Sequence, residues 1–157
     1  MTRGLRIILD YRPALRERTG VGEYVHEMAR ALSAAAAGSA DTVTAFSSSW
    51  KDRLDPARLP GLNVVDARVP VSVLNFAWHW LEWPPIERFV GAADIAHSAH
   101  PLLMPARDAL RVVTIHDLDF LDHPERTRRE IRRDYPALAG AHARRADLVV
   151  VSSRHTA

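Results

Sequence analysis

The sequence has no cysteine, a single lysine and no long apolar run. Without cysteine the chain can form neither a disulfide framework nor a thiolate metal site, which fits a reducing cytoplasm. No segment approaches the ~18 consecutive apolar residues of a membrane span, and the N-terminus lacks the apolar core of a signal peptide. These absences predict a cytoplasmic protein. If it associates with a membrane, we expect peripheral contact at the inner face.

The sequence also has no large excess of charge of one sign, because it contains 21 basic and 19 acidic residues and its net charge is +2. Apart from Lys51 every basic residue is arginine, but no aromatic residues are interleaved with the arginines in the way that stacks bases. We therefore expect no nucleic-acid partner.

At 157 residues the chain has the size of one ordinary domain. Its apolar pattern alternates between short β-branched runs and segments of helical spacing, which indicates an α/β, Rossmann-like, doubly wound parallel sheet with right-handed crossovers. The proline pair at 84–85 should end one helix. Pro136 should either kink the helix predicted over 124–146 or start a second helix there. The predicted strands are 5–10, 42–47, 62–69, 94–97, 112–115 and 148–152, and the predicted helices are 20–37, 71–82, a short one through 89, and 124–146.

Residues 153–157 have the pattern of the first turn of a further helix. A natural domain rarely stops at a helix start. We therefore expect residues 1–157 to be one N-terminal domain of a truncated, longer protein.

The segment from Arg111 to Asp119 is the strongest candidate for chemistry. Its β-branched run predicts a buried parallel strand that delivers His116 and Asp117 to its carboxyl end. Ligands bind at that edge of open α/β sheets, where an imidazole can act as a base or a sugar-hydroxyl partner. A histidine there can equally cap a loop or bind a backbone carbonyl, so both interpretations stand.

A glycine-containing segment, Thr19, Gly20, Val21 and Gly22, opens the first predicted helix. Free N–H groups and the positive end of the helix dipole could hold a phosphate there, although a simple turn explains the glycines as well. A dinucleotide site is disfavoured, because Val25 occupies the third glycine position and Asp41 precedes the second strand.

Four stretches in order along the chain resemble the N-terminal half of a family 4 (group 1) glycosyltransferase with the GT-B fold. They are Ile8-Leu-Asp-Tyr-Arg12 with Thr19-Gly-Val-Gly-Glu-Tyr24, Asp94-Ile-Ala-His-Ser98 with Leu103-Met-Pro105, Val112-Val-Thr-Ile-His-Asp-Leu118 with His123-Pro-Glu125, and Arg145-Ala-Asp-Leu-Val-Val-Val-Ser-Ser153.

The resemblance implies a retaining hexosyltransferase that moves a sugar from a nucleotide-diphosphate donor to a sugar or lipid-linked acceptor, with no metal and no further cofactor. It implies that residues 19–22 lie against the donor diphosphate or the acceptor, and that His116 sits near the donor sugar. Asp117 would orient His116 or its loop. Tyr24, His97 and Ser98 would line the acceptor pocket.

In such enzymes the nucleotide-binding residues belong to a second, C-terminal domain, so we expect these 157 residues alone to be inactive. The alternative is a non-catalytic α/β module that binds a nucleotide or sugar and pairs with another chain. Sequence beyond Ala157 would discriminate between them.

Three further features have competing interpretations. A divalent metal site at His97, His100, His116 and Asp117 is disfavoured, because the adjacent His-Asp pairs of metal hydrolases lie on helices. An aromatic segment is expected mainly to pack in the core, and the sharper hypothesis is that it contacts a lipid-linked acceptor or the membrane interface. This segment contains Leu74, Phe76, Trp78, Trp80, Leu81 and Trp83.

A basic helix face is either solvated or binds an anionic membrane or a phosphate group. This face contains Arg126, Arg128, Arg129, Arg132 and Arg133.

Overall fold

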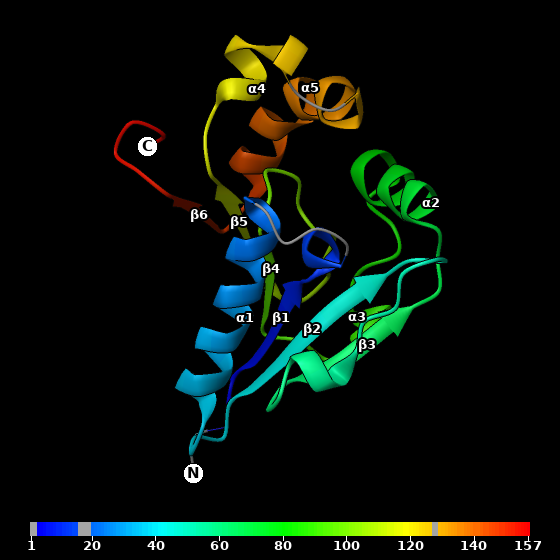
Figure 1. Cartoon of the computed structure of the whole chain (residues 1–157), viewed down its shortest axis with the longest axis vertical. Helices are drawn as coiled ribbons and strands as arrows, with labels where there is room; N and C mark the ends of the chain where they lie inside the picture. Colours follow the sequence, from blue (N-terminus) through cyan, green and yellow to red (C-terminus); the bar gives the residue numbers. More distant parts are fainter. Residues whose placement is uncertain (1–2, 16–19, 127–128) are drawn as a thin grey trace.

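A computed structural model describes residues 3–15, 20–126 and 129–157, with side chains except at 124 and 129–134. Its centre is one six-stranded sheet in the order β3-β2-β1-β4-β5-β6, in which every paired strand is parallel (Figure 1). This is the Rossmann-like α/β fold that the alternating pattern predicted. The strands are β1 (Arg6–Asp10), β2 (Thr42–Ser48), β3 (Asn63–Ala67), β4 (Ile95–Ser98), β5 (Leu110–Ile115) and β6 (Leu148–Val151).

The strand order reverses between β1 and β4. The chain builds outward from β1 to β3, crosses back to β4, and builds outward again to β6. A crevice forms at the carboxyl ends of the strands where the order reverses, and ligands of open α/β sheets bind in it. In Figure 1 the strands point toward the end of the molecule where α2, α4 and part of α5 lie.

The helices connect these strands. The α-helices are α1 (Val21–Ala36), α2 (Val71–Phe76), α3 (Glu87–Val90), α4 (Asp119–Asp122) and α5 (Arg129–Arg145); α2 runs directly into the π-helical turn η3 (Ala77–Leu81), and the 3-10 turns are η1 (Arg12–Ala14), η2 (Pro56–Arg58) and η4 (Pro124–Arg126).

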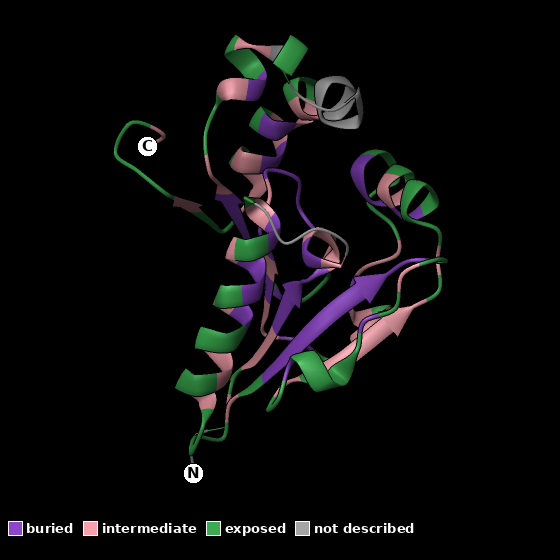
Figure 2. Cartoon of the chain, viewed as in Figure 1, coloured by how far each residue is buried: buried purple, intermediate pink, exposed green. Residues whose placement is uncertain are grey.

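Two apolar cores form because neighbouring residues of a strand point to opposite faces of the sheet. Ile8 belongs to one core with Phe46 and Trp78, and the next residue, Leu9, belongs to the other with Val25. Figure 2 shows β2, in the middle of the sheet, as buried along most of its length. Trp78 is completely buried and its ring centroid lies 5.5 Å from that of Phe46.

The expectation of core packing for the aromatic segment is only partly right. Leu74 and Trp78 are buried, but Phe76, Trp80, Leu81 and Trp83 are at least half exposed. A short helix lying on a sheet edge has only one face against the core, so the apolar residues on its other face stay uncovered.

Other predicted elements differ in detail. α5 continues through Pro136, so this proline does not start a second helix. Residues 153–157 form a turn, closed by a 3.3 Å hydrogen bond from Thr156 N to Ser153 O, where a helix start was expected. Among the described residues, no helix is both long and apolar enough to cross a bilayer.

Candidate functional site

Polar side chains gather where β1, β4 and β5 end. β1 ends at Asp10, His100 lies two residues beyond β4, and His116 directly follows β5. Because these three strands are neighbours and run parallel, their carboxyl ends share one edge, at the point where the strand order reverses.

His116 is half-buried, and both its ring and its backbone have contacts. Its Nε2 donates to the carbonyl of Ala99 at 3.1 Å, and its own carbonyl accepts hydrogen bonds from Ser152 and Thr156. Of the two interpretations of this histidine, the structure shows the one in which the ring binds a backbone carbonyl. Because the proton sits on Nε2 in the neutral ring, the bond also leaves Nδ1 as a hydrogen-bond acceptor.

The glycine segment reaches the same edge through α1. The ring of Tyr24, in the first turn of α1, meets the His116 ring edge-on, with centroids 4.6 Å apart. Gly20 is the N-cap residue with φ of +54°, and it has no side chain of its own to cap the helix. The first N–H groups of a helix have no partner within the helix, so the start of α1 is a candidate anion site. Thr19 lies outside the described residues.

His97 and Ser98 each make a hydrogen bond within the domain at the end of β4. His97 Nε2 is 2.8 Å from Thr114 Oγ1 on β5, and burial lowers the pKa of His97 to about 4, so the ring is neutral. The fully buried Ser98 accepts a 2.8 Å hydrogen bond from Met104 N and so fixes the loop after β4. Their contact with an acceptor stays a prediction.

Asp117 fixes the start of the next element. Its Oδ1 accepts a hydrogen bond from Asp119 N at 3.1 Å, which turns the chain from β5 into α4. The contact orients the loop that follows His116. A role of Asp117 in catalysis stays a prediction.

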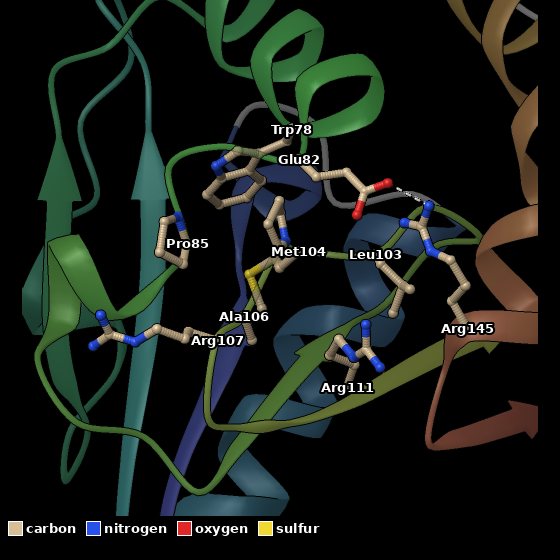
Figure 3. A pocket seen from close by; sticks show the side chains of 10 residues that line it. Trp78, Glu82, Pro85, Leu103, Met104, Ala106, Arg107, Arg111 and Arg145 are labelled. Atoms are coloured by element: carbon tan, nitrogen blue, oxygen red, sulfur yellow. Dashed lines mark hydrogen bonds and ion pairs between the residues drawn. The ribbon is translucent and has the colours of Figure 1, made fainter.

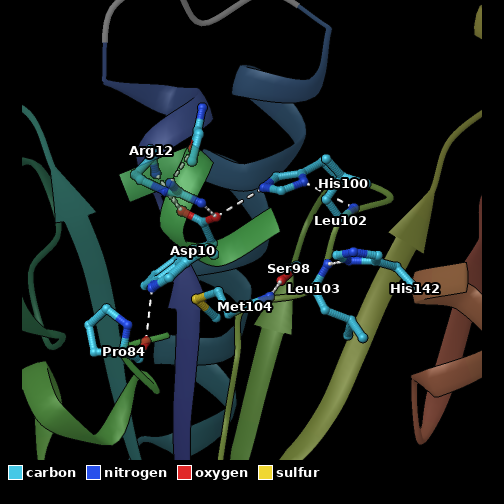
Figure 4. Close-up of polar contacts among 11 residues, drawn as sticks. Asp10, Arg12, Pro84, Ser98, His100, Leu102, Leu103, Met104 and His142 are labelled. Carbon is cyan, nitrogen blue, oxygen red and sulfur yellow. Dashed lines mark hydrogen bonds and ion pairs between the residues drawn. The ribbon is translucent and has the colours of Figure 1, made fainter. Parts of the chain in front are cut away.

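A buried ion pair stands beside these residues and was not predicted as part of the site. Arg12 holds both oxygens of Asp10, from Nε at 2.9 Å and from Nη2 at 2.7 Å, and its Nη1 donates to Asn75 Oδ1 at 2.7 Å. His100 Nε2 lies 3.0 Å from Asp10 Oδ2, as Figure 4 shows beside Arg12. The Arg12 guanidinium also stacks 4.5 Å from the Trp78 ring centroid. We call Asp10, Arg12, Asn75 and His100 the Asp10 network.

The charge of the Asp10 network is settled by its contacts. Burial by itself raises the pKa of Asp10, but the charge of Arg12 and the hydrogen bonds from Arg12 and His100 outweigh it and hold this pKa far below the usual range. His100 Nδ1 accepts from Leu102 N at 3.3 Å, so Nε2 carries the proton that it donates to Asp10. The network joins the ends of β1 and β4 to α2.

The sequence alone could indicate only two members of this network, Asp10 and Arg12. Asp10 ends a predicted strand as His116 follows one, and Arg12 is two residues away. His100 and Asn75 come from distant segments, and only the strand order brings them to Asp10.

The metal site considered from the sequence would use His97, His100, His116 and Asp117. Across residues 3–15, 20–126 and 129–157 no three histidine or acidic side chains form a group that could hold an ion. His97, His100 and His116 each have a protein partner instead, namely Thr114, Asp10 and the Ala99 carbonyl.

A pocket of about 220 Å³ lies apart from these residues, between η3 and α5 (Figure 3). An ion pair from Arg145 to Glu82 spans the two elements. None of the predicted site residues lines the pocket; its lining consists of Trp78, Glu82, Pro85, Leu103, Met104, Pro105, Ala106, Arg107, Arg111 and Arg145.

Comparison with known proteins identifies a family for this chain. A family model, Glycosyltransferase Family 4, matches residues 18–157. No curated protein and no solved structure matches the chain. The matched part begins after β1 and takes in the glycine segment, β4 and the strand that ends before His116.

Proposed function

The chain belongs to glycosyltransferase family 4, and from this premise we propose that it is the acceptor-side half of a retaining hexosyltransferase with a nucleotide-diphosphate sugar as donor. The family and the Rossmann-like sheet support glycosyl transfer in general. Retention, the type of donor and the acceptor side are the proposed part.

The contact between Tyr24 and His116 carries the proposal. It joins the start of α1 to the imidazole at the end of β5, with 4.6 Å between ring centroids. A ligand at this edge can therefore meet backbone N–H donors and an imidazole together. These are the two groups needed by a reaction in which a sugar departs from a diphosphate.

Each group has a role that follows from its chemistry. As the bond between sugar and diphosphate breaks, negative charge grows on the diphosphate, and the N–H groups of residues 20–22 stabilise it. His116 Nδ1 accepts a hydrogen bond from a hydroxyl of the donor sugar, because Nε2 is already bound to Ala99. Tyr24 limits the motion of the imidazole, and the sugar is thereby positioned for the acceptor.

The donor nucleotide is held, in this proposal, by a second Rossmann-like half that lies outside these 157 residues. The isolated chain then releases no nucleoside diphosphate from UDP-glucose or GDP-mannose. The enzyme that joins this chain to its donor half releases the nucleoside diphosphate from its preferred donor.

The test is His116→Ala in that joined enzyme. Loss of an interaction made at the reacting sugar should lower kcat/KM at least ~100-fold, or about 3 kcal/mol of transition-state stabilisation. His155→Ala is the matched control, because His155 is an exposed histidine in the C-terminal turn and should leave kcat/KM unchanged. Circular dichroism should be the same for both variants. Near-normal turnover by His116→Ala would remove this residue from the mechanism.

A further inference from the structure

The loop after β4, residues 99–104, holds the ring of His116. His116 Nε2 donates to the carbonyl of Ala99, the first residue of this loop, at 3.1 Å, and Ala99 is completely buried. A carbonyl only accepts, so in the neutral ring this bond keeps the proton on Nε2 and leaves Nδ1 as an acceptor. The tautomer and the orientation of the imidazole are therefore set by the position of the Ala99 carbonyl.

The rest of this loop is fixed by side chains that accept hydrogen bonds from its backbone. Residues 101–104 are buried, and buried N–H groups need such partners. Three consecutive N–H groups have one each: Leu102 N donates to His100 Nδ1 at 3.3 Å, Leu103 N to His142 Nδ1 at 2.9 Å and Met104 N to Ser98 Oγ at 2.8 Å (Figure 4). The loop keeps one conformation while these three side chains stay in place.

Among the three, His100 has the most direct connection to the Ala99 carbonyl. The atoms of a peptide unit lie in one plane, so this carbonyl and the Cα of His100 belong to the same rigid group. The His100 ring is fixed in turn, because its Nε2 donates to the buried Asp10 at 3.0 Å and the Tyr135 ring of α5 stacks on it with centroids 6.3 Å apart. A displacement of the His100 ring would therefore turn the Ala99 carbonyl away from His116.

We propose that His100, held by Asp10, is a positioning residue for His116. His100 fixes the Ala99 peptide, and this peptide fixes the imidazole with its proton on Nε2. The consequence for catalysis rests on the proposed function, in which Nδ1 accepts a hydrogen bond from the donor sugar. The Asp10 network thereby acts on the reaction through the backbone, from the end of β1 through the loop after β4 to the end of β5.

Two amides at position 100 that differ by one methylene group test this proposal. In His100→Gln the amide nitrogen takes the place of Nε2 and keeps the contact with Asp10. In His100→Asn the side chain is too short to reach Asp10, but its oxygen still accepts from Leu102 N. The two variants therefore differ in the contact with Asp10 and share the contact within the loop.

Nitrogen-15 NMR of the imidazole rings measures the outcome in the chain itself, because it distinguishes a ring nitrogen with a proton from one without. The signal of His116 is the one that disappears in His116→Ala. At pH ~8, where imidazole is neutral, wild type and His100→Gln should have His116 protonated on Nε2 alone. In His100→Asn both tautomers should be populated, because the Ala99 carbonyl no longer has a fixed position.

His26→Ala is the matched control. His26 is also a buried histidine that bonds a distant segment, with its Nδ1 2.7 Å from the Tyr11 hydroxyl. Its loss should destabilise the chain to urea and still leave His116 in the Nε2 tautomer. A pure Nε2 tautomer in His100→Asn would overturn the inference. So would mixed tautomers in His100→Gln, which decides the matter even if His100→Asn does not fold.

The joined enzyme separates this inference from the proposed function. There His100→Asn should lower kcat by up to ~100-fold with little change in KM, and His100→Gln should stay within ~3-fold of wild type. If the tautomer follows position 100 but His116→Ala transfers sugar normally, the positioning stands and the role of His116 in transfer falls. If His116→Ala is inactive but its tautomer in the wild-type background is independent of position 100, the proposed function stands and this inference falls.

Discussion

Asp10 is fully buried and ionised because Arg12 lies against it. The side chains of this pair are 0% and 7% exposed, whereas those of the pair between Asp108 and Arg107 are 71% and 73% exposed. Chemically the pairs are alike, but water surrounds only the second. Removing one charge from a buried pair leaves the other without compensation, so the energetic consequences should differ greatly.

We predict that Asp10→Asn lowers the free energy of unfolding by about 3 to 5 kcal/mol, because the Arg12 guanidinium stays buried without a counter-charge. Asp108→Asn, the matched exposed control, should change it by less than about 0.5 kcal/mol. Urea denaturation at pH 7 measures both. Equal effects of the two substitutions would mean that the Asp10 network does not hold the site edge together.

The start of α1 depends on the backbone of one residue. Gly20 has φ of +54° and ψ of −118°, which side chains with a Cβ rarely adopt. A Cβ added there would meet no atom of the described residues within 4 Å, so the expected cost comes from the backbone conformation. Gly140, inside α5, has ordinary helical geometry and only a 3.6 Å neighbour, the Arg144 side chain.

Substitution by alanine should therefore have opposite effects at these two glycines. Gly20→Ala should cost about 1 to 3 kcal/mol of unfolding free energy through strain. Gly140→Ala should add up to about 1 kcal/mol, because alanine loses less backbone freedom in a helix. Thermal and urea denaturation of the two variants decide this. A stabilising Gly20→Ala would show that the start of α1 has another conformation.

The stability of the whole molecule should depend on pH through two buried histidines. Burial lowers the pKa of His97 to about 4, and burial together with the charge of Arg145 lowers that of His142 to about 4. In the unfolded chain both titrate near pH ~6.5. Between these values the unfolded chain takes up protons that the folded chain refuses, so stability is full above pH ~6.5 and is lost as the pH falls toward 4.

We predict a loss on the order of 2 kcal/mol per histidine between pH 7 and pH 5. His97→Gln, which keeps a polar partner for Thr114, should flatten this slope by about half. His123→Gln, at a histidine whose side chain is 45% exposed, should leave the slope as it is. Urea midpoints at pH 7, 6 and 5 give the slopes. Asp10 does not contribute to this slope between pH 7 and pH 5. Its pKa is lowered in the folded chain, so its stabilisation is lost only below pH ~4.

Local pattern alone determined much of this protein. β-branched runs and helical spacing predicted six strands and the long helices, because strands inside a parallel sheet bury both faces and an amphipathic helix buries one. Alternation of the two predicted the parallel sheet, and four short motifs indicated the family. His116 and residues 20–22 could be chosen because a strand end and a helix start are defined by neighbours in the sequence.

The tertiary structure alone decided which residues meet and which stay uncovered. Asp10 and His100 are 90 residues apart, and only the crossover from β3 to β4 makes β1 and β4 neighbours. Composition marked the segment around Trp78 as apolar, but the face it buries depends on where α2 crosses the sheet edge. Periodicity describes one element at a time, whereas burial and ion pairing are set by contacts between elements.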